Sequence, residues 1–331
     1  MQTRDYLIVG AGPCGLSAAV ELKKRGFNPL VMDKGCIVNS VYGFPTFMIF
    51  FSTPELLEIG DLPFITQGEK PTRLEALKYY RAVASHFDLD IHQYETVTRI
   101  ERETDRFIVH TVKQDKRKAH YSAERIIIAT GYFDNPNLLN IPGEDLEKVH
   151  HYFKEAHPYF GQKAVVIGGK NSAVDAAMEL EKAGVDVTMV YRRSAFTKSV
   201  KAWVKPVIES AIEKGRIRMY WNAHVTEIKP DTVVVEQEGR RFELENDVVF
   251  ALTGYSPDRS LLEQLGVMIN TETGVPEHNP DTMETNVPGV YIAGVLAAGY
   301  DANSIFIENG RFHGKVIAEA ASQKEEPTHP M

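Results

Sequence analysis

The sequence predicts an α/β protein of two domains, each a parallel sheet with helices, and two glycine-rich turns are the main reason. The first turn, Gly10-Ala-Gly-Pro-Cys-Gly15, follows an apolar strand and opens a helix. The second, Gly168-Gly-Lys-Asn-Ser-Ala173, stands in the same strand–turn–helix context. A helix N-terminus after such a turn binds phosphate through free backbone N–H groups. Two such turns therefore predict two dinucleotide-binding, Rossmann-like domains.

The elements of the first domain follow from apolar patterning on either side of the first turn. Strands at 6–10 and 30–33 flank a helix from about residue 14 to 25, which Gly26 ends. A loop-rich, aromatic segment from 35 to 71 precedes a helix at 73–87. Three alternating strands come next, near 97–103, 106–113 and 119–128, and the last stops at Thr130-Gly131.

The second domain repeats this organisation. Strands at 164–167 and 187–191 enclose a helix at 172–183, and a buried strand stops at Thr253-Gly254. Further strands are expected near 217–220, 225–229, 232–237 and 242–245. The tail, a strand ending at Gly294 and a helix from about 304 to 323, is interpreted as completing the first domain. The expected boundaries are 1–133 with 257–331 for one domain and 134–256 for the inserted one.

Composition excludes several classes of protein. The 331 residues suffice for two ordinary domains, and the net charge of -8 argues against a nucleic-acid partner. No apolar run approaches the ~18 residues that span a bilayer, so no membrane association is expected. The two cysteines, Cys14 and Cys36, are too few for a disulfide framework and lack the spacing of metal ligands. We therefore expect no metal site and a cytoplasmic location.

The first turn has the residues of a complete dinucleotide site. Gly10 permits the tight bend, Gly12 admits a pyrophosphate close to the backbone, and Gly15 allows the helix to pack on the strand. Asp33, at the end of the second strand, is placed to accept hydrogen bonds from ribose hydroxyls.

The second turn departs from this pattern. Lys170 occupies a position where glycine usually admits the pyrophosphate, so it either weakens binding or pairs with a phosphate. At the end of the next strand, Arg192 and Arg193 stand where an acid would indicate NAD. Two guanidinium groups there suit a ribose 2′-phosphate and predict NADPH.

Cys14 lies in the first turn of the first helix. That position is expected to lower the pKa of its thiol, because the helix dipole favours the thiolate. Cys14 is then either a nucleophile or a small residue that fills space. Cys36 shows no recognisable chemistry.

Together these features resemble the small two-dinucleotide flavoproteins of the thioredoxin-reductase type. The resemblance covers nearly the whole chain and rests on both turns, both Thr-Gly stops and the late strand ending at Gly294. Two departures stand out. A Cys-x-x-Cys pair is replaced by His-Tyr-Phe-Lys at 151–154, and Val295 replaces an acid that would bind the flavin.

A narrower resemblance, to bacillithiol disulfide reductases, accommodates both departures. It rests on the two turns and on the segments 51–64, 293–295 and 301–310. It implies FAD, NADPH and a low-molecular-weight disulfide substrate, with Cys14 as the catalytic residue. A helix beginning near Asn303-Ser304 would point at the flavin. The implied FAD contacts are Gly10, Gly12, Pro13, Cys14, Gly15, Asp33, Lys34, Ser52, Val97, Thr130, Gly131, Gly294, Val295, Asn303 and Ser304. The implied NADPH contacts are Gly168, Gly169, Lys170, Asn171, Ser172, Ala173, Arg192 and Arg193.

Three other functions share much of this pattern. A ferredoxin- or flavodoxin-NADP reductase has the same fold and needs no thiol. A flavin monooxygenase resembles the segment from 141 to 168, although a complete Phe-x-Gly-x-x-x-His signature is missing. A non-catalytic redox sensor would use Cys14 as a switch. The expected enzyme passes hydride from NADPH to FAD and then reduces a disulfide, and it is expected to be a homo-oligomer.

Overall fold

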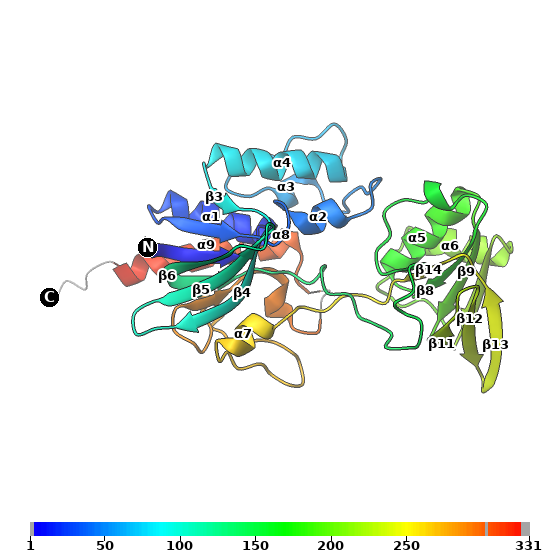
Figure 1. Cartoon of the computed structure of the whole chain (residues 1–331). Coiled ribbons are helices and arrows are strands. Elements are labelled where there is room, and N and C mark those ends of the chain that lie inside the picture. Colours follow the sequence, from blue (N-terminus) through cyan, green and yellow to red (C-terminus); the bar gives the residue numbers. More distant parts are fainter. Residues whose placement is uncertain (1–2, 302–303, 326–331) are drawn as a thin grey trace. The chain divides into compact units, whose positions relative to one another are not determined.

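The computed structural model describes residues 3–301 and 304–325, which form two compact units (Figure 1). The first unit comprises residues 1–42, 48–135 and 256–331. The second comprises residues 43–47 and 136–255. The short segment 43–47 therefore belongs to the second unit although the chain on both sides of it belongs to the first.

The first unit is built on a seven-stranded sheet in the order β3-β2-β1-β6-β5-β4, with β15 also paired to β6. Strands β1, β2, β3, β6 and β15 are parallel, whereas β4 and β5 form an antiparallel meander that ends on β6. The bounds are β1 Thr3–Val9, β2 Pro29–Met32, β3 Asp90–His92, β4 Glu95–Arg102, β5 Phe107–Lys113, β6 Lys118–Ile128 and β15 Val290–Ile292. The strand–helix–strand opening and the three strands expected between residues 97 and 128 are confirmed.

Strand β6 changes partner along its length, and this brings three chain segments together. Its first part pairs with β5, and its last part pairs with β15. Its other edge pairs with β1 from Ser122 to Ile128. Ile128 is in register with both Val9 and Ile292, so all three strands end side by side. The turns that follow β1, β6 and β15 therefore meet at one edge of the sheet.

Helices cover this sheet, and α1 packs against α9. The bounds are α1 Pro13–Lys24, α2 Asn39–Gly43, α3 Pro54–Leu57, α4 Arg73–His86, α7 Ser260–Gln264, α8 Ile307–Gly310 and α9 His313–Glu325, with a 3₁₀ helix, η2, at Gly294–Ala298. The single helix expected from about 304 is wrong: α8 begins at Ile307 and α9 is separate. The Asn309 side chain accepts from the Phe306 N–H and donates to the Ser304 carbonyl, so it caps the start of α8.

The second unit has a five-stranded parallel sheet in the order β10-β9-β8-β14-β7 and a three-stranded antiparallel sheet, β11-β12-β13 (Figure 1). The parallel strands are β7 Val149–His150, β8 Lys163–Ile167, β9 Asp186–Tyr191, β10 Ile217–Trp221 and β14 Val248–Ala251. The others are β11 Ala223–Ile228, β12 Thr232–Gln237 and β13 Arg240–Glu245. The helices are α5 Asn171–Lys182 and α6 Lys205–Glu213, with a 3₁₀ helix, η1, at His157–Tyr159.

Alternation along β8 explains how this unit is layered. Ala164 and Val166 pack into one apolar core with α5 and α6. Val165 and Ile167 point to the opposite face and pack with residues of the three-stranded sheet. A strand covered on both faces is apolar throughout, as the sequence of β8 is. Among the described residues, none of the helices combines the length and apolar character needed to cross a membrane.

The close approach of β1 and β6 predicts different effects for two neighbouring glycines. Gly10 has φ +111°, and a Cβ there would lie 2.4 Å from the Ala129 carbonyl oxygen. Gly10→Ala should therefore lower the free energy of unfolding by about 2–4 kcal/mol. Gly12 has φ -73°, and a Cβ there would meet no atom within 4 Å. Gly12→Ala should cost less than about 1 kcal/mol in urea unfolding. Equal losses for both variants would contradict this account.

Candidate functional site

The first turn is fastened to the end of β2 by Asp33. The Gly10 N–H donates to the Met32 carbonyl at 2.7 Å, and the Ala11 N–H donates to the Asp33 carboxylate at 2.8 Å. The other carboxylate oxygen accepts from the Gly35 N–H at 2.7 Å. Burial raises the pKa of Asp33, and these two backbone hydrogen bonds oppose that shift. The Asp33 carboxylate, which is predicted to bind ribose hydroxyls, is thus held in one orientation beside the turn.

A cavity of about 240 Å³ opens next to this carboxylate. It brings together residues that the resemblance implied as FAD contacts, namely Gly10, Asp33, Lys34, Val97, Thr130 and Gly131. The Thr130 Oγ1 is buried and has no hydrogen-bond partner among the described residues, so it is available to a ligand. Two larger hollows along β4 contain neither glycine-rich turn.

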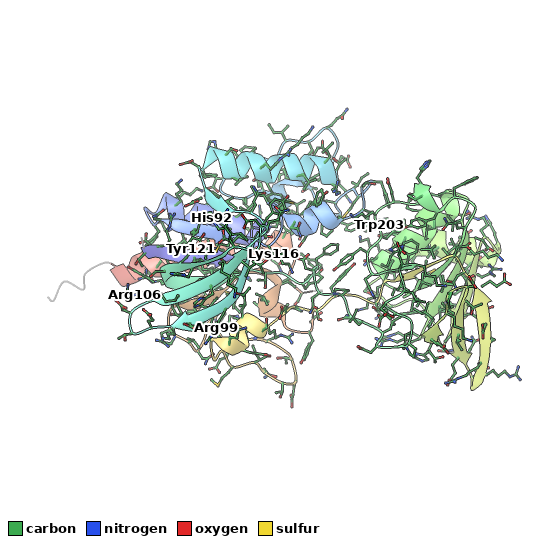
Figure 2. The ribbon with its side chains drawn as sticks, in the orientation of Figure 1. His92, Arg99, Arg106, Lys116, Tyr121 and Trp203 are labelled. Atoms are coloured by element: carbon green, nitrogen blue, oxygen red, sulfur yellow. The ribbon has the colours of Figure 1, made fainter. Side chains whose placement is uncertain are left out.

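Glu95, which the sequence reading missed, is a buried carboxylate on the wall of the same cavity. The Thr111 hydroxyl donates to it at 2.5 Å, and the His92 Nδ1 lies 3.2 Å away. Burial, and then Glu95, raise the pKa of Tyr121 to about 12. Figure 2 shows His92 and Tyr121 close together, and their ring centroids are 5.4 Å apart. Glu95 begins β4 just before Val97, so this cluster fixes the strand that lines the cavity.

The N-terminus of α1 has room for a phosphate. Gly12 is its N-cap, Pro13 is its first residue, and no side chain caps the helix. The N–H groups of the first turn are therefore left for a ligand. Open space at Gly12, a donor at Thr130 and a fixed carboxylate at Asp33 are what a dinucleotide requires, so these residues fit FAD.

The Cys14 sulfur is enclosed between two glycines. A Cβ on Gly294 would lie 3.1 Å from Sγ, and a Cβ on Gly310 would lie 3.0 Å from it. Although Cys14 keeps some exposed surface as a residue, its sulfur is buried, and burial followed by the Glu308 charge raises the thiol pKa to about 12. The expectation that the helix terminus lowers this pKa is wrong, because desolvation and a nearby carboxylate outweigh the helix dipole.

Several contacts join the segments around Cys14. The Ser52 hydroxyl donates to the Glu308 carboxylate, which places an expected FAD contact against α8. The Ser17 hydroxyl donates to the Arg311 carbonyl at 2.6 Å, and the Arg311 guanidinium donates to the Glu58 carbonyl. Helix α1, the segment around α3 and helix α8 are thereby linked. Glu308 lies within the 301–310 segment, but nothing in the sequence shows that it faces a thiol.

The remaining expected FAD contacts lie in the late strand and the loop after it. Gly294 and Val295 open η2, and Val295 is buried. The Ser304 hydroxyl donates to the Asp301 carbonyl at 2.8 Å. Asn303 lies outside the described residues. The Cys36 thiol donates to the Asn39 Oδ1 at 3.6 Å. Neither Cys14 nor Cys36 is in a disulfide.

The second unit places its cations at the end of adjoining parallel strands. The Gly168 N–H donates to the Val190 carbonyl at 3.1 Å, so the turn after β8 lies beside the end of β9. Lys170, Arg192 and Arg193 are all exposed. Within the described part of the chain, none of these three side chains is in an ion pair. They are available for an anionic ligand.

The other residues of the second turn have different tasks. Gly169 lies under the Tyr191 ring, Ala173 packs against Gly168, and Ser172 is exposed in the first turn of α5. The Asn171 amide donates to the Ser199 carbonyl at 2.8 Å and accepts from the Lys201 N–H at 3.1 Å. Asn171 therefore fastens the loop after Arg193 to the helix that the turn opens.

Comparison with known proteins decides the family. Residues 7–294 match the model of the pyridine nucleotide-disulphide oxidoreductases. This chain belongs to that family. It is 50% identical over 321 residues to a Bacillus subtilis protein named bacilliredoxin reductase, covering 96% of this chain and 98% of that one. The structure of bacillithiol disulfide reductase from Bacillus cereus matches with a TM-score of 0.96 and 50% identity, over 98% of this chain and 100% of that one.

Other matches agree with this assignment. The structure of bacillithiol disulfide reductase from Staphylococcus aureus matches with a TM-score of 0.94 and 47% identity, covering 98% of this chain and 100% of that one. A more distant match shows the fold alone: the T. acidophilum thioredoxin reductase is 23% identical with a TM-score of 0.76, over 98% of this chain and 99% of that one. The predicted fold class, the resemblance and the oxidoreductase class are confirmed, and the cofactors of such enzymes are FAD and NADPH.

The enclosure of the sulfur predicts how Cys14 reacts. Because its thiol pKa is raised to about 12, the reactive thiolate is scarce near neutral pH. Iodoacetamide at about pH 8 should leave Cys14 unmodified in the folded protein and modify it fully in guanidinium chloride, as peptide mass spectrometry would show. A Cys36→Ser background removes the second thiol. Labelling of folded Cys14 at the rate of a free thiol would contradict the enclosure.

Proposed function

We propose that the protein is an NADPH-dependent reductase of a low-molecular-weight thiol disulfide, bacillithiol disulfide. The overall change is NADPH, a proton and one disulfide giving NADP⁺ and two thiols. The FAD-binding domain would comprise 1–133 and 257–331, and the NADPH-binding domain 134–256. One observation supports this most strongly: a cysteine in the FAD turn, enclosed by Gly294 and Gly310, occurs in a chain half identical to a protein named for this reaction.

In the first unit, the residues bind and orient the flavin, which supplies two-electron transfer when bound. The turn at Gly10–Gly15 and the α1 N-terminus would hold the pyrophosphate. Asp33 would accept from ribose hydroxyls, since its carboxylate is already oriented by two backbone N–H groups. Lys34 and Val97 would line the rest of the nucleotide site, and Ser52, Gly294, Val295 and Ser304 the flavin end.

In the second unit, the exposed cations would bind NADPH. Gly168 to Ala173 would hold the pyrophosphate at the start of α5, with Lys170 contributing a charge where a glycine is usual. Arg192 and Arg193 would bind the 2′-phosphate, because guanidinium groups form paired hydrogen bonds with phosphate oxygens.

Cys14 is the proposed thiol that meets the substrate. To attack a disulfide, its sulfur must first lose a proton, which burial and Glu308 oppose in the enclosed arrangement. Attack by the Cys14 thiolate would break the substrate's S–S bond, form a mixed disulfide at Cys14 and release the first thiol. The second thiol would leave when another thiol, or two electrons derived from NADPH, reduces that mixed disulfide. The free state of both cysteines suits a reducing cytoplasm.

A protein disulfide is the second candidate substrate, because the Bacillus subtilis relative is named bacilliredoxin reductase. A ferredoxin acceptor has weaker support, from a ferredoxin–NADP reductase of Ignicoccus hospitalis that is 30% identical over 298 residues, covering 88% of this chain and 89% of that one.

A substrate panel separates these functions. NADPH oxidation by the FAD-loaded protein should depend on bacillithiol disulfide, and Cys14→Ala should lower that rate at least about tenfold while retaining FAD. The same assay is run with oxidised bacilliredoxin, with ferredoxin, or with oxygen as the sole electron acceptor. Turnover with bacilliredoxin but not with bacillithiol disulfide would favour the second candidate. An undiminished rate in Cys14→Ala would remove Cys14 from the reaction.

The coenzyme assignment has a separate test. Replacing Arg192 and Arg193 by Ala should raise the half-saturating NADPH concentration for anaerobic flavin reduction about 100-fold, since two charge-assisted contacts are lost. The value for NADH should change less than about threefold, because NADH has no 2′-phosphate. Lys182→Ala, at the other end of α5, is the matched control. An equal rise in the half-saturating concentrations of NADPH and NADH would show that Arg192 and Arg193 do not recognise the 2′-phosphate.

A further inference from the structure

We propose that His313 is a positioning residue for the flavin site: its neutral imidazole holds the Gly294 turn against the Cys14 sulfur. The identity of the bound group as a flavin follows from the family, and the role of Cys14 rests on the proposed function. The hydrogen bond and the packing described next do not depend on either.

His313 binds the backbone of the turn that encloses the sulfur. The Gly294 N–H donates to the His313 Nδ1 at 3.0 Å. Gly294 has φ +75°, so the turn takes a backbone conformation that side chains disfavour. The turn follows β15 directly and precedes the buried Val295. The imidazole thus fixes the backbone at the point where β15 ends beside the first turn.

The imidazole is itself held in place by tight helix packing. His313 is the first residue of α9, and the next residue, Gly314, approaches α1 closely. A Cβ on Gly314 would lie 2.5 Å from the Ala18 Cα, so α9 can approach α1 here only because this residue is glycine. Ala18 lies one helical turn after Cys14 in α1. Helix α1 therefore carries Cys14 and also packs against the start of α9, where His313 binds the Gly294 turn.

The hydrogen bond requires a neutral ring with its proton on Nε2. Only that form leaves a lone pair on Nδ1 to accept from an N–H. Burial, and then the charge of His278, lower the pKa of His313 to about 4. The His278 Nδ1 lies 2.7 Å from the Pro276 carbonyl, which orients its ring. His313 consequently remains an acceptor at every pH where the protein is expected to work.

Loss of this acceptor would loosen the site around the sulfur. Gly294 and Gly310 both lie close to Cys14 Sγ, and a Cβ on Gly310 would lie 3.3 Å from the Gly294 Cα. A shift of the Gly294 amide toward another acceptor would therefore open space at the sulfur. Val295 replaces the acid that the thioredoxin-reductase resemblance implies here, and the Gly294 N–H beside it is bound by an imidazole.

The test compares a variant that keeps a hydrogen-bond acceptor at position 313 with one that has none. His313→Asn retains an acceptor oxygen near the position of Nδ1, whereas His313→Leu has none. We expect His313→Leu to bind FAD about tenfold more weakly and to expose Cys14 to alkylation about tenfold faster, with His313→Asn within about threefold of the parent. FAD binding is followed by fluorescence on the apoprotein and alkylation by mass spectrometry. The exposed His86, exchanged for Leu, is the control.

Two results would overturn the proposal. One is a His313→Leu protein that equals the parent in both measurements. The other is a His313→Asn protein as impaired as His313→Leu, which would show that ring shape matters and the acceptor does not. If His313→Leu fails to fold, ¹⁵N NMR spectra of the His313 ring in the parent protein test the proposal through the tautomer of the imidazole. The Nε2–H tautomer should persist between about pH 5 and pH 8, and titration in that range contradicts the proposal. No disulfide substrate is used, so failure of the proposed function would leave these outcomes unaffected.

Discussion

The parallel pairing of β6 with both β1 and β15 is the constraint on which the first unit depends. Because Ile128 is in register with Val9 and Ile292, the turns after the three strands begin at the same level. The glycine-rich turn, Thr130-Gly131 and Gly294 then converge without any loop having to reach across the sheet. The antiparallel β5 pairs with the earlier part of β6, which leaves the last residues free for β15. A site assembled from residues 10, 130 and 294 follows from the pairing of one strand.

The features that sequence reasoning predicted are those encoded locally. A turn between a strand and a helix is recognisable from Gly10, Gly12 and Gly15, and Asp33 follows at a fixed spacing because the second strand is in register with the first. The same logic located Gly168 and the arginines after β9. In each case the chemistry and the structure that positions it lie within one strand–helix–strand unit, so the pattern of residues is sufficient.

The features that the sequence did not reveal depend on residues far apart in the chain. The pKa of Cys14 was predicted to fall from its helix position, but Glu308 and two distant glycines determine its surroundings. Asn171 looks like part of a phosphate turn, yet its amide binds a loop about thirty residues later. Glu95 and His313 have unremarkable neighbours in the sequence and become informative only through Thr111 and Gly294. The start of α8 at Ile307 likewise depends on the Asn309 side chain, which accepts from the Phe306 N–H.

The enclosure of Cys14 by Gly294 and Gly310 means that three positions share one small volume. A side chain added at position 310 would crowd the Cys14 sulfur, so the residues at positions 14 and 310 cannot change size independently. Position 294 has less freedom still, since its backbone conformation disfavours any side chain whatever stands at 14. The three positions thus form one packing unit, in which a bulkier residue at any one of them would crowd the other two.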